Sequence, residues 1–289
     1  MITFSIIIPV YQQVTHLREA LESALNQTTP PLEVIVVDDG SELLYADHIR
    51  EICTNVDGVQ LIRIDQNQGV SHARNAGAKV AKGNYLIFLD ADDLMDAVFL
   101  ESCTNALAKN PADVLMGKSL LFKGELDQKT FSKKQKTYQY LTQKYHLSSP
   151  RQPSYISIYC PAIHGLVFKK RVFDRFHFNE SLRYGEDRFL MLQLRYEGLT
   201  IVPVDLTAGY YRLGSSAGYP TNSKLEYVHS TLKTDFLLSR EDRAYLLFLR
   251  GIYMFRIGKN KKALGAFFQG LSSFSALRKI ISLVILRIF

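Results

Sequence analysis

The sequence predicts an α/β protein with a doubly wound, mostly parallel sheet flanked by helices, followed by a C-terminal helical appendage. Short apolar runs rich in β-branched residues alternate with amphipathic stretches in the N-terminal part of the chain, a pattern typical of parallel βα units. Polar residues follow these runs directly, as they do at the ligand-binding edge of such sheets. From residue 224 onward the pattern is helical, with a break around residues 258–260.

Strands and helices are expected to alternate from the N-terminus. We expect strands at residues 4–10, 32–37, 59–64 and 85–89, and helices at residues 15–25, 43–53 and 71–81. The runs IIIPV, VIVV and YLIFL are too short for helices and rich in β-branched or aromatic residues, which favours strands. The ends of the four strands should therefore meet at one edge of the sheet.

The pattern becomes less regular beyond residue 110. Residues 117–155 are polar and contain a basic run and two prolines, which predicts a mobile, partly helical excursion. Further along, we expect strands at residues 165–168, 201–204 and 208–212, and a helix that begins around residues 185–187.

Composition limits the classes of protein to which the chain can belong. With 47% hydrophobic and 22% charged residues it is close to the globular average, which excludes a disordered chain and a many-pass membrane protein. Cys53, Cys103 and Cys160 are odd in number and widely spaced, which argues against a disulfide scaffold or a zinc site. The N-terminus has neither a basic segment nor a small-residue cleavage site, so we expect a strand there and a cytoplasmic protein.

Two acidic clusters follow apolar runs. Asp38 and Asp39 end one expected strand, and Asp90, Asp92 and Asp93 follow another. A single aspartate there is more often a helix cap or turn residue, but carboxylates crowded at one sheet edge need a cation or hydrogen-bond donors. Oxygen ligands suit Mg²⁺ or Mn²⁺, which bind through one or two carboxylates together with substrate phosphates. A nucleotide diphosphate is the implied ligand.

The sequence offers few other groups for binding phosphate. It contains neither GxxxxGK[ST] nor a GxGxxG after the first strand, so it supports neither a P-loop nor a dinucleotide fingerprint. Arg74 lies in the first turns of an expected helix, where the helix dipole disfavours a cation. It should therefore have either a ligand or a carboxylate partner.

Five blocks of sequence carry a family resemblance. They are SIIIPVYQ at 5–12, VIVVDDGS at 34–41, NQGVSHARNAG at 67–77, GNYLIFLDADD at 83–93 and FNESLRYGEDRF at 178–189. Together and in this order, they resemble the family 2 glycosyltransferases, enzymes of the GT-A fold. The resemblance implies transfer of a sugar from a nucleotide-diphosphate donor, with UDP as the expected nucleotide and inversion of the anomeric centre.

The resemblance also implies roles for individual residues of the donor site. The implied nucleotide-sugar-binding residues are Pro9, Tyr11, Asp38, Asp39, Arg74, Asp90 and Asp93, and the implied metal ligand is Asp92. Pro9 and Tyr11 would line the base, and an acid of the second strand end, Asp39, would receive the base's N–H. In the DxD element, Asp90 would lie near the ribose, and Asp93 would lie towards the sugar.

Glu186 and Asp187 are similar to the catalytic ED pair of the family, in which the aspartate is the general base. An acceptor hydroxyl has a pKa far above neutrality and needs a carboxylate to take its proton, while a metal stabilises the leaving diphosphate. The alternative is that the two acids only cap a helix.

One departure from the family concerns the metal. Family members often have a histidine shortly after a Tyr-Arg pair, whereas here Tyr211 and Arg212 are followed by a glycine at that place. A third protein ligand is therefore in doubt. His164 is either a substitute, an acceptor-site residue or a structural histidine, and Arg212 is a candidate for contact with the diphosphate.

The expected activity is that of a metal-dependent, inverting glycosyltransferase that uses Mn²⁺ or Mg²⁺. Its acceptor would be a saccharide or a lipid-linked saccharide in bacterial surface polysaccharide synthesis. Residues 1–220 would form the catalytic domain, with nucleotide-sugar binding in 1–110 and the acceptor and base region in 111–220, and residues 221–289 a basic helical region. One alternative is a nucleotidyltransferase, which would need a Gly-rich basic loop in place of PVYQQ. Another is a non-catalytic nucleotide-sugar-binding module.

The C-terminal segment is strongly basic. Residues 240–289 contain ten Lys or Arg against two acids, interleaved with Leu, Ile and Phe, which favours a membrane surface over nucleic acid. The apolar runs are shorter than the ~20 residues that cross a bilayer, so we expect peripheral binding to anionic lipid. The alternative is packing against the catalytic domain or a second subunit, as in a homodimer.

Overall fold

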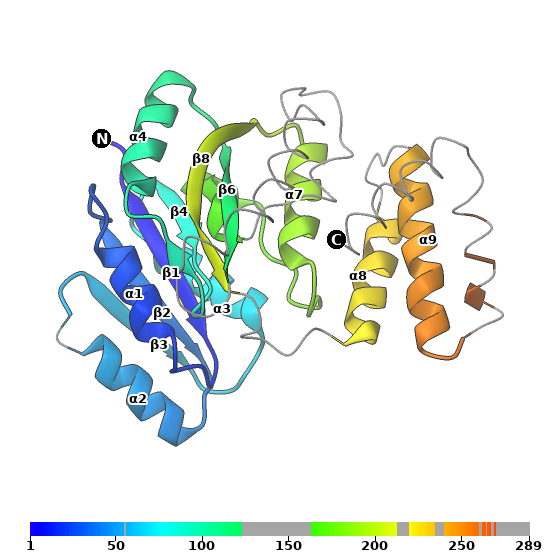
Figure 1. Cartoon of the computed structure of the whole chain (residues 1–289), viewed down its shortest axis with the longest axis horizontal. Coiled ribbons are helices and arrows are strands. Elements are labelled where there is room, and N and C mark those ends of the chain that lie inside the picture. The colour runs from blue at the N-terminus through cyan, green and yellow to red at the C-terminus, as the bar shows by residue number, and fades with distance from the viewer. Residues whose placement is uncertain are drawn as a thin grey trace. The chain divides into compact units, whose positions relative to one another are not determined.

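The computed structural model describes residues 1–54, 56–122, 163–212, 220–234 and 240–259, and residues 262, 263, 265, 266 and 269. The chain divides into two compact units (Figure 1). The first contains the described residues of 1–150, 160–180 and 198–217, and the second those of 181–197 and 218–289.

The first unit is built on an eight-stranded sheet of described residues with the order β3-β2-β1-β4-β7-β6-β8-β5. The strands are β1 (Phe4–Val10), β2 (Glu33–Asp39), β3 (Val59–Ile64), β4 (Tyr85–Phe88), β5 (Leu94–Met95), β6 (Val114–Phe122), β7 (Leu166–Lys169) and β8 (Ile201–Arg212). β1 to β4 pair in parallel, as do β6 and β8, whereas β7 is antiparallel to β4 and β6 and β5 is antiparallel to β8. The predicted fold class is confirmed.

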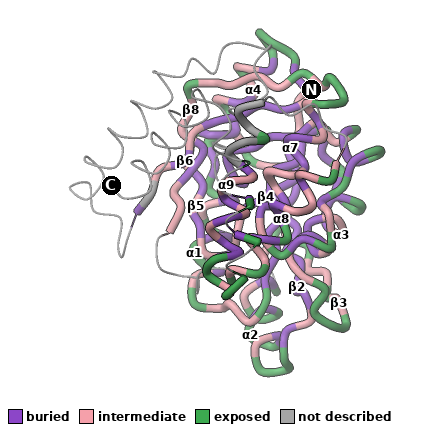
Figure 2. The backbone as a smooth tube through the Cα atoms, turned by 90° about the vertical axis from the view of Figure 1, so that its right-hand side faces the viewer, coloured by how far each residue is buried: buried purple, intermediate pink, exposed green. Residues whose placement is uncertain are grey.

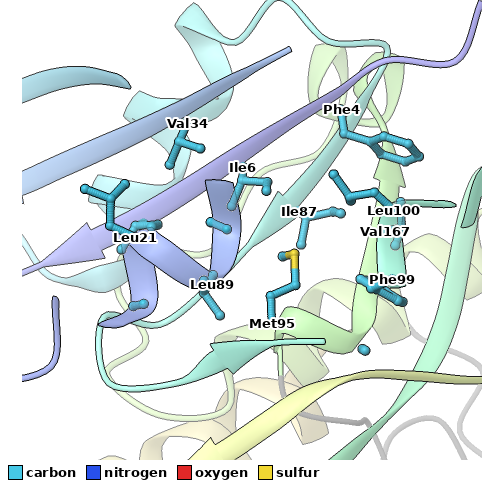
Figure 3. Close-up of a cluster of buried hydrophobic side chains, with 14 of the residues drawn as sticks. Phe4, Ile6, Leu21, Val34, Ile87, Leu89, Met95, Phe99, Leu100 and Val167 are labelled. Carbon is cyan, nitrogen blue, oxygen red and sulfur yellow. The ribbon is translucent and has the colours of Figure 1, made fainter. Parts of the chain in front are cut away.

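Helices cover both faces of the sheet. They are α1 (Leu17–Leu25), α2 (Leu43–Cys53), α3 (Val70–Val80) and α4 (Phe99–Lys109). Successive side chains of a strand point to opposite faces, so Ile6 and Ile8 join a core with α1, α2 and α4 (Figure 3). Ile7 faces α3 instead, where a Cβ on Gly77 would lie 2.4 Å from its side chain. A larger residue at 77 would therefore push the helix off the sheet.

Burial follows the position of each strand in the sheet. Every residue of β1 and β2 is buried, whereas the edge strand β3 has only half-buried and exposed residues (Figure 2). The long apolar runs of β1 and β2 are thus explained by burial on both faces, as in other parallel sheets.

The structure corrects two expectations in the less regular part of the sequence. Residues 117–122, predicted as part of an excursion, belong to β6, and residues 123–155 lie outside the described residues. β6 lies between β7 and β8 in the sheet and pairs with β7 over residues 114–116. Its pairing with β8 continues to Phe122 despite the interruption at residues 117–119, where the register shifts. The two strands predicted at 201–204 and 208–212 are one strand, β8.

The second unit is helical over its described residues. It contains α7 (Glu186–Tyr196), α8 (Thr221–Lys233) and α9 (Arg240–Arg256). α8 and α9 pack through a buried apolar cluster that includes Leu225, Val228, Leu246 and Leu249. The helical C-terminal region is therefore confirmed for these residues. Within the described part of the chain, no helix is both long and apolar enough to span a membrane.

Candidate active site

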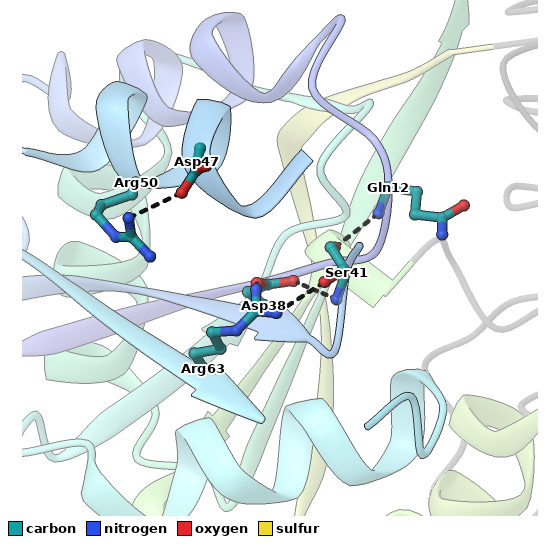
Figure 4. A network of polar contacts seen from close by, with 6 residues as sticks. All are labelled: Gln12, Asp38, Ser41, Asp47, Arg50 and Arg63. Atoms are coloured by element: carbon teal, nitrogen blue, oxygen red, sulfur yellow. Dashed lines mark hydrogen bonds and ion pairs between the residues drawn. The ribbon is translucent and has the colours of Figure 1, made fainter. Parts of the chain in front are cut away.

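The turn after β2 is held by Asp38. Its buried carboxylate accepts hydrogen bonds from Arg63 Nη1 at 2.5 Å and from the backbone N–H of Ser41 at 3.0 Å (Figure 4). Arg63 Nη2 also donates to the Ser41 carbonyl oxygen at 2.8 Å, and Ser41 Oγ accepts from the backbone N–H of Gln12 at 2.9 Å. Gln12 has a positive φ of 52°. This network ties the segment after β1 to the turn after β2, and it uses both oxygens of Asp38.

Asp39 joins the same turn to the loop after β3. Its carboxylate accepts from the backbone N–H groups of Gln68 at 3.0 Å and Gly69 at 2.7 Å. Gly40 has a φ of +71°, and a Cβ there would lie 2.4 Å from the backbone nitrogen of Asn67. A carboxylate offers about four lone-pair positions, so two backbone bonds leave Asp39 able to accept from a further donor such as a base N–H.

The turn between β4 and β5 carries the second acidic cluster. Asp90 Oδ1 accepts from Arg74 Nη2 at 2.7 Å, and the buried guanidinium of Arg74 lies 5.4 Å from the ring centroid of Phe178. Of the two partners expected for Arg74, the structure therefore shows the carboxylate. Because β2, β1 and β4 are neighbouring parallel strands, the two acidic clusters, one at the end of β2 and one after β4, lie at the same edge of the sheet.

Asp93 is turned into the protein. Its carboxylate is 1% exposed, with Oδ2 lying 3.2 Å from Nδ1 of the fully buried His164 and Oδ1 accepting from the backbone N–H of Arg212 at 2.9 Å. Burial raises the pKa of Asp93 to about 6, although its bonds to His164 and Arg212 oppose the increase. This geometry favours a supporting role for Asp93 over the expected contact with the sugar.

Arg212 also binds the turn through its side chain. Its Nε donates to the backbone carbonyl of Asp92 at 2.9 Å, and its Nη2 pairs with Glu19 of α1 at 2.6 Å. The guanidinium carbon lies 4.5 Å from the ring centroid of Phe122. The side chain that was a candidate for the diphosphate is thus engaged with three parts of the protein.

The carboxylates fit a metal that shares its coordination with a ligand. Among the described residues, no three histidine, cysteine or acidic side chains are grouped so as to hold a metal ion by themselves. Mg²⁺ and Mn²⁺ in phosphate-transfer sites need only one or two carboxylates, because phosphates and water complete the shell. The half-buried Asp92 suits this role, whereas His164 is fully buried, with its Nδ1 lying 3.2 Å from Asp93 Oδ2.

The predicted base-lining residues lie at the end of β1. Pro9 is a buried residue of the strand, and Tyr11 follows the strand with 45% of its surface exposed. An exposed aromatic ring at the ligand edge of the sheet is available for stacking on a base.

Glu186 and Asp187 form the first turn of α7 in the second unit. Gly185, which precedes them, has a φ of +72°, and a Cβ there would lie 2.7 Å from the ring of Tyr227. Glu186 is buried, whereas Asp187 is half-buried and accepts from the backbone N–H of Arg188 at 2.7 Å. Carboxylates in a first helical turn are stabilised by the helix dipole, and Asp187 is the more accessible of the two.

The supporting residues Arg63 and Glu19 were not anticipated from the sequence. Arg63 is the register partner of Asp38 across β2 and β3, so correct strand alignment would have found it. Glu19 is one of several exposed charges on α1, and nothing in its local sequence marks it.

Comparisons with known proteins agree with this architecture. The model of the family "Glycosyl transferase family 2" matches residues 5–181. The glycosyltransferase GlyA of Streptococcus pneumoniae is 28% identical over 64% of the chain, and the minor teichoic acid biosynthesis protein GgaB of Bacillus subtilis is 29% identical over 65%. The chain spans only 27% and 20% of the lengths of these two relatives.

Solved structures share the fold. S. aureus TarS residues 1–349 in complex with UDP has a TM-score of 0.60 at 19% identity, covering 93% of this chain and 81% of that one. The mannosyltransferase PcManGT of Pyrobaculum calidifontis in complex with GDP-Man and Mn²⁺ has a TM-score of 0.62 at 17% identity, covering 99% and 80%. With the fold, the acidic strand ends and the family model in agreement, the chain belongs to glycosyltransferase family 2.

Proposed function

We propose that this chain is an inverting glycosyltransferase that moves a sugar from a UDP-sugar donor to a saccharide or lipid-linked saccharide. The observation that carries the proposal is the pair of acidic clusters, one at the end of β2 and one after β4, at one sheet edge in a chain of glycosyltransferase family 2. Two relatives, one named for minor teichoic acid biosynthesis and one named a poly(ribitol-phosphate) beta-glucosyltransferase, support a role in bacterial surface polysaccharide assembly.

The donor would bind across the ends of β1, β2 and β4. Tyr11 would stack on the base and Asp39 would accept its N–H, since Asp39 keeps acceptor capacity beside its two backbone bonds. Asp90, already oriented by Arg74, would face the ribose. Asp92 would hold Mn²⁺ or Mg²⁺, and a bound metal would supply Lewis-acid stabilisation of the leaving diphosphate.

The chemical step needs a base for the acceptor. The acceptor oxygen attacks the anomeric carbon, the bond from that carbon to the diphosphate oxygen breaks, and its electron pair leaves with UDP. Asp187 takes the proton of the acceptor hydroxyl. The accessibility of Asp187, compared with the buried Glu186, supports this division of roles. A single displacement of this kind inverts the anomeric centre.

The family match favours glycosyl transfer over nucleotidyl transfer. The remaining alternative is a module of the same family that binds a nucleotide sugar without turning it over. Release of UDP from a UDP-sugar in the presence of a saccharide acceptor, lost in Asp187→Asn, distinguishes an enzyme from such a module.

A thermal-unfolding panel tests the donor. UDP-GlcNAc, UDP-glucose, UDP-galactose and GDP-mannose are added with and without Mn²⁺, because a ligand that binds only the folded state raises the unfolding midpoint by mass action. We expect a UDP-sugar to give the largest increase, and to give it only with Mn²⁺. An increase with GDP-mannose alone would show that the donor has been misassigned.

We also propose that the basic C-terminal segment attaches the protein to the inner face of an anionic membrane. Leu246 and Leu249 of α9 are buried against α8, so the attachment is assigned to the basic and apolar residues that follow α9. Lipid attachment would bring the enzyme to a lipid-linked acceptor.

Flotation with anionic liposomes tests the attachment. A variant with Arg278, Lys279 and Arg287 changed to Gln removes three basic charges and leaves the sequence of α9 unchanged. The unmodified chain should float at low salt, and the variant should not. Equal flotation of both would contradict attachment through these basic residues, and flotation of neither together with a dimer in sedimentation would assign the segment to packing between subunits.

A further inference from the structure

The residue next to the candidate metal ligand is fixed from two sides. Asp93 places both carboxylate oxygens on distant parts of the chain, with His164 lying 71 residues away and Arg212 lying 119 residues away in sequence. We call these three residues the Asp93 anchor. Because Asp93 is buried, its charge would be costly without these partners.

Arg212 of the anchor also holds the backbone that directly follows Asp92. Arg212 Nε donates to the Asp92 carbonyl at 2.9 Å, and the Asp93 N–H donates to the Asp90 carbonyl at 3.0 Å. The peptide unit that follows the Asp92 Cα is therefore bonded through both its carbonyl oxygen and its N–H. The same arginine reaches Glu19 of α1, so the turn is connected to β8, α1 and the 3₁₀ helix at Ile163–Gly165.

We propose that His164 and Arg212 are positioning residues that hold the Asp92 carboxylate where a metal on the donor phosphates requires it. This inference rests on the proposed function, because it takes Asp92 as the metal ligand. Groups that orient metal ligands commonly change metal affinity or activity by about 10–100-fold when they are removed. In this role, His164 does not coordinate the metal as a third ligand, but supports the ligand Asp92 through its contact with Asp93.

Calorimetry of UDP binding with and without Mn²⁺ tests the inference on the full chain. His164→Ala should weaken UDP binding in Mn²⁺ by about 10–100-fold and leave metal-free binding within about twofold. His164→Asn should recover most of the loss, because its amide N–H can replace Nδ1 as the donor to Asp93. His48→Ala, at an exposed position of α2, is the matched control and should bind as the unmodified protein does.

A second variant covers the case in which His164→Ala does not fold. Arg212→Ala removes the bond to the Asp92 carbonyl but keeps the backbone N–H that reaches Asp93. This variant should also lose the gain in UDP affinity that Mn²⁺ gives. Retention of the full gain by folded His164→Ala or Arg212→Ala would overturn the inference and leave the proposed function standing. Absence of any gain in the unmodified protein would instead overturn the proposed metal site, and the inference with it.

Discussion

Replacing Arg63 with Met should destabilise the fold without much effect on nucleotide binding. The change removes the 2.5 Å bond to the buried Asp38 and the bond to the Ser41 carbonyl. Breaking a fully buried ion pair costs about 3–5 kcal/mol. Here the Arg63 side chain is 35% exposed, so water can reach the pair, and Asp38 keeps the Ser41 N–H. We therefore expect a loss of about 2 kcal/mol.

Urea and thermal unfolding measure this loss, which should lower the midpoint temperature by about 4–8 °C. Asp38→Asn keeps an acceptor for Ser41 and removes the charge, so the double variant with Arg63→Met should lose less than the sum of the single losses. UDP affinity should change by less than about threefold in both single variants, since a two- to threefold change is below 1 kcal/mol. Two results together would refute this reasoning: a stability loss under about 0.5 kcal/mol in Arg63→Met, and a large loss of UDP affinity in Asp38→Asn. They would show that Asp38 contacts the donor and that its role in the turn is minor.

Two further predictions concern the general base of the reaction and the dependence of stability on acidic pH. Asp187→Asn should lower kcat by about 10²–10⁴ with nearly unchanged UDP affinity, as expected for a lost general base; a larger effect of Glu186→Gln in steady-state kinetics would assign the base to the other acid. Hydrogen bonds from Asn75 and His72 lower the pKa of Glu180 below its ordinary value of 4.5, so they stabilise the fold above that pH and lose their effect as pH falls through the lowered pKa. Glu180→Gln should therefore reduce the difference in unfolding midpoint between pH 6 and pH 3, and an unchanged difference would contradict this account.

The strands with long apolar runs were predictable from the sequence. β1 has the predicted bounds, and β2 and β4 agree within two residues at each end, because burial on both faces of a parallel sheet demands continuous apolar residues. The edge strand β3 also has its predicted bounds, although none of its residues is buried. β6 was missed because Gly117, Lys118 and Ser119 interrupt its pattern, and only pairing with β7 and β8 makes it a strand. α4 and β5 were also missing from the prediction.

The positions of the acidic clusters were predictable, but their partners were not. A sequence shows that Asp38, Asp39 and Asp93 follow apolar runs, and it does not show which cation or backbone N–H each will meet. Arg63 reaches Asp38 through strand register, and His164 reaches Asp93 across 71 residues of sequence. The geometry therefore suggests that Asp38 and Asp93 support their turns, and it keeps Asp39, Asp90 and Asp92 as the candidates for donor and metal.

The most direct test of metal-dependent donor binding is calorimetry of UDP with the unmodified chain in Mn²⁺ and in EDTA, repeated with Asp92→Ala. Asp47→Asn, an exposed acid of α2, is the matched control. We predict that EDTA and Asp92→Ala each reduce UDP affinity by at least about tenfold, since removing even a group that only orients a metal ligand costs about 10–100-fold, while Asp47→Asn binds normally. Equally tight UDP binding in EDTA, or in Asp92→Ala with Mn²⁺, would contradict it.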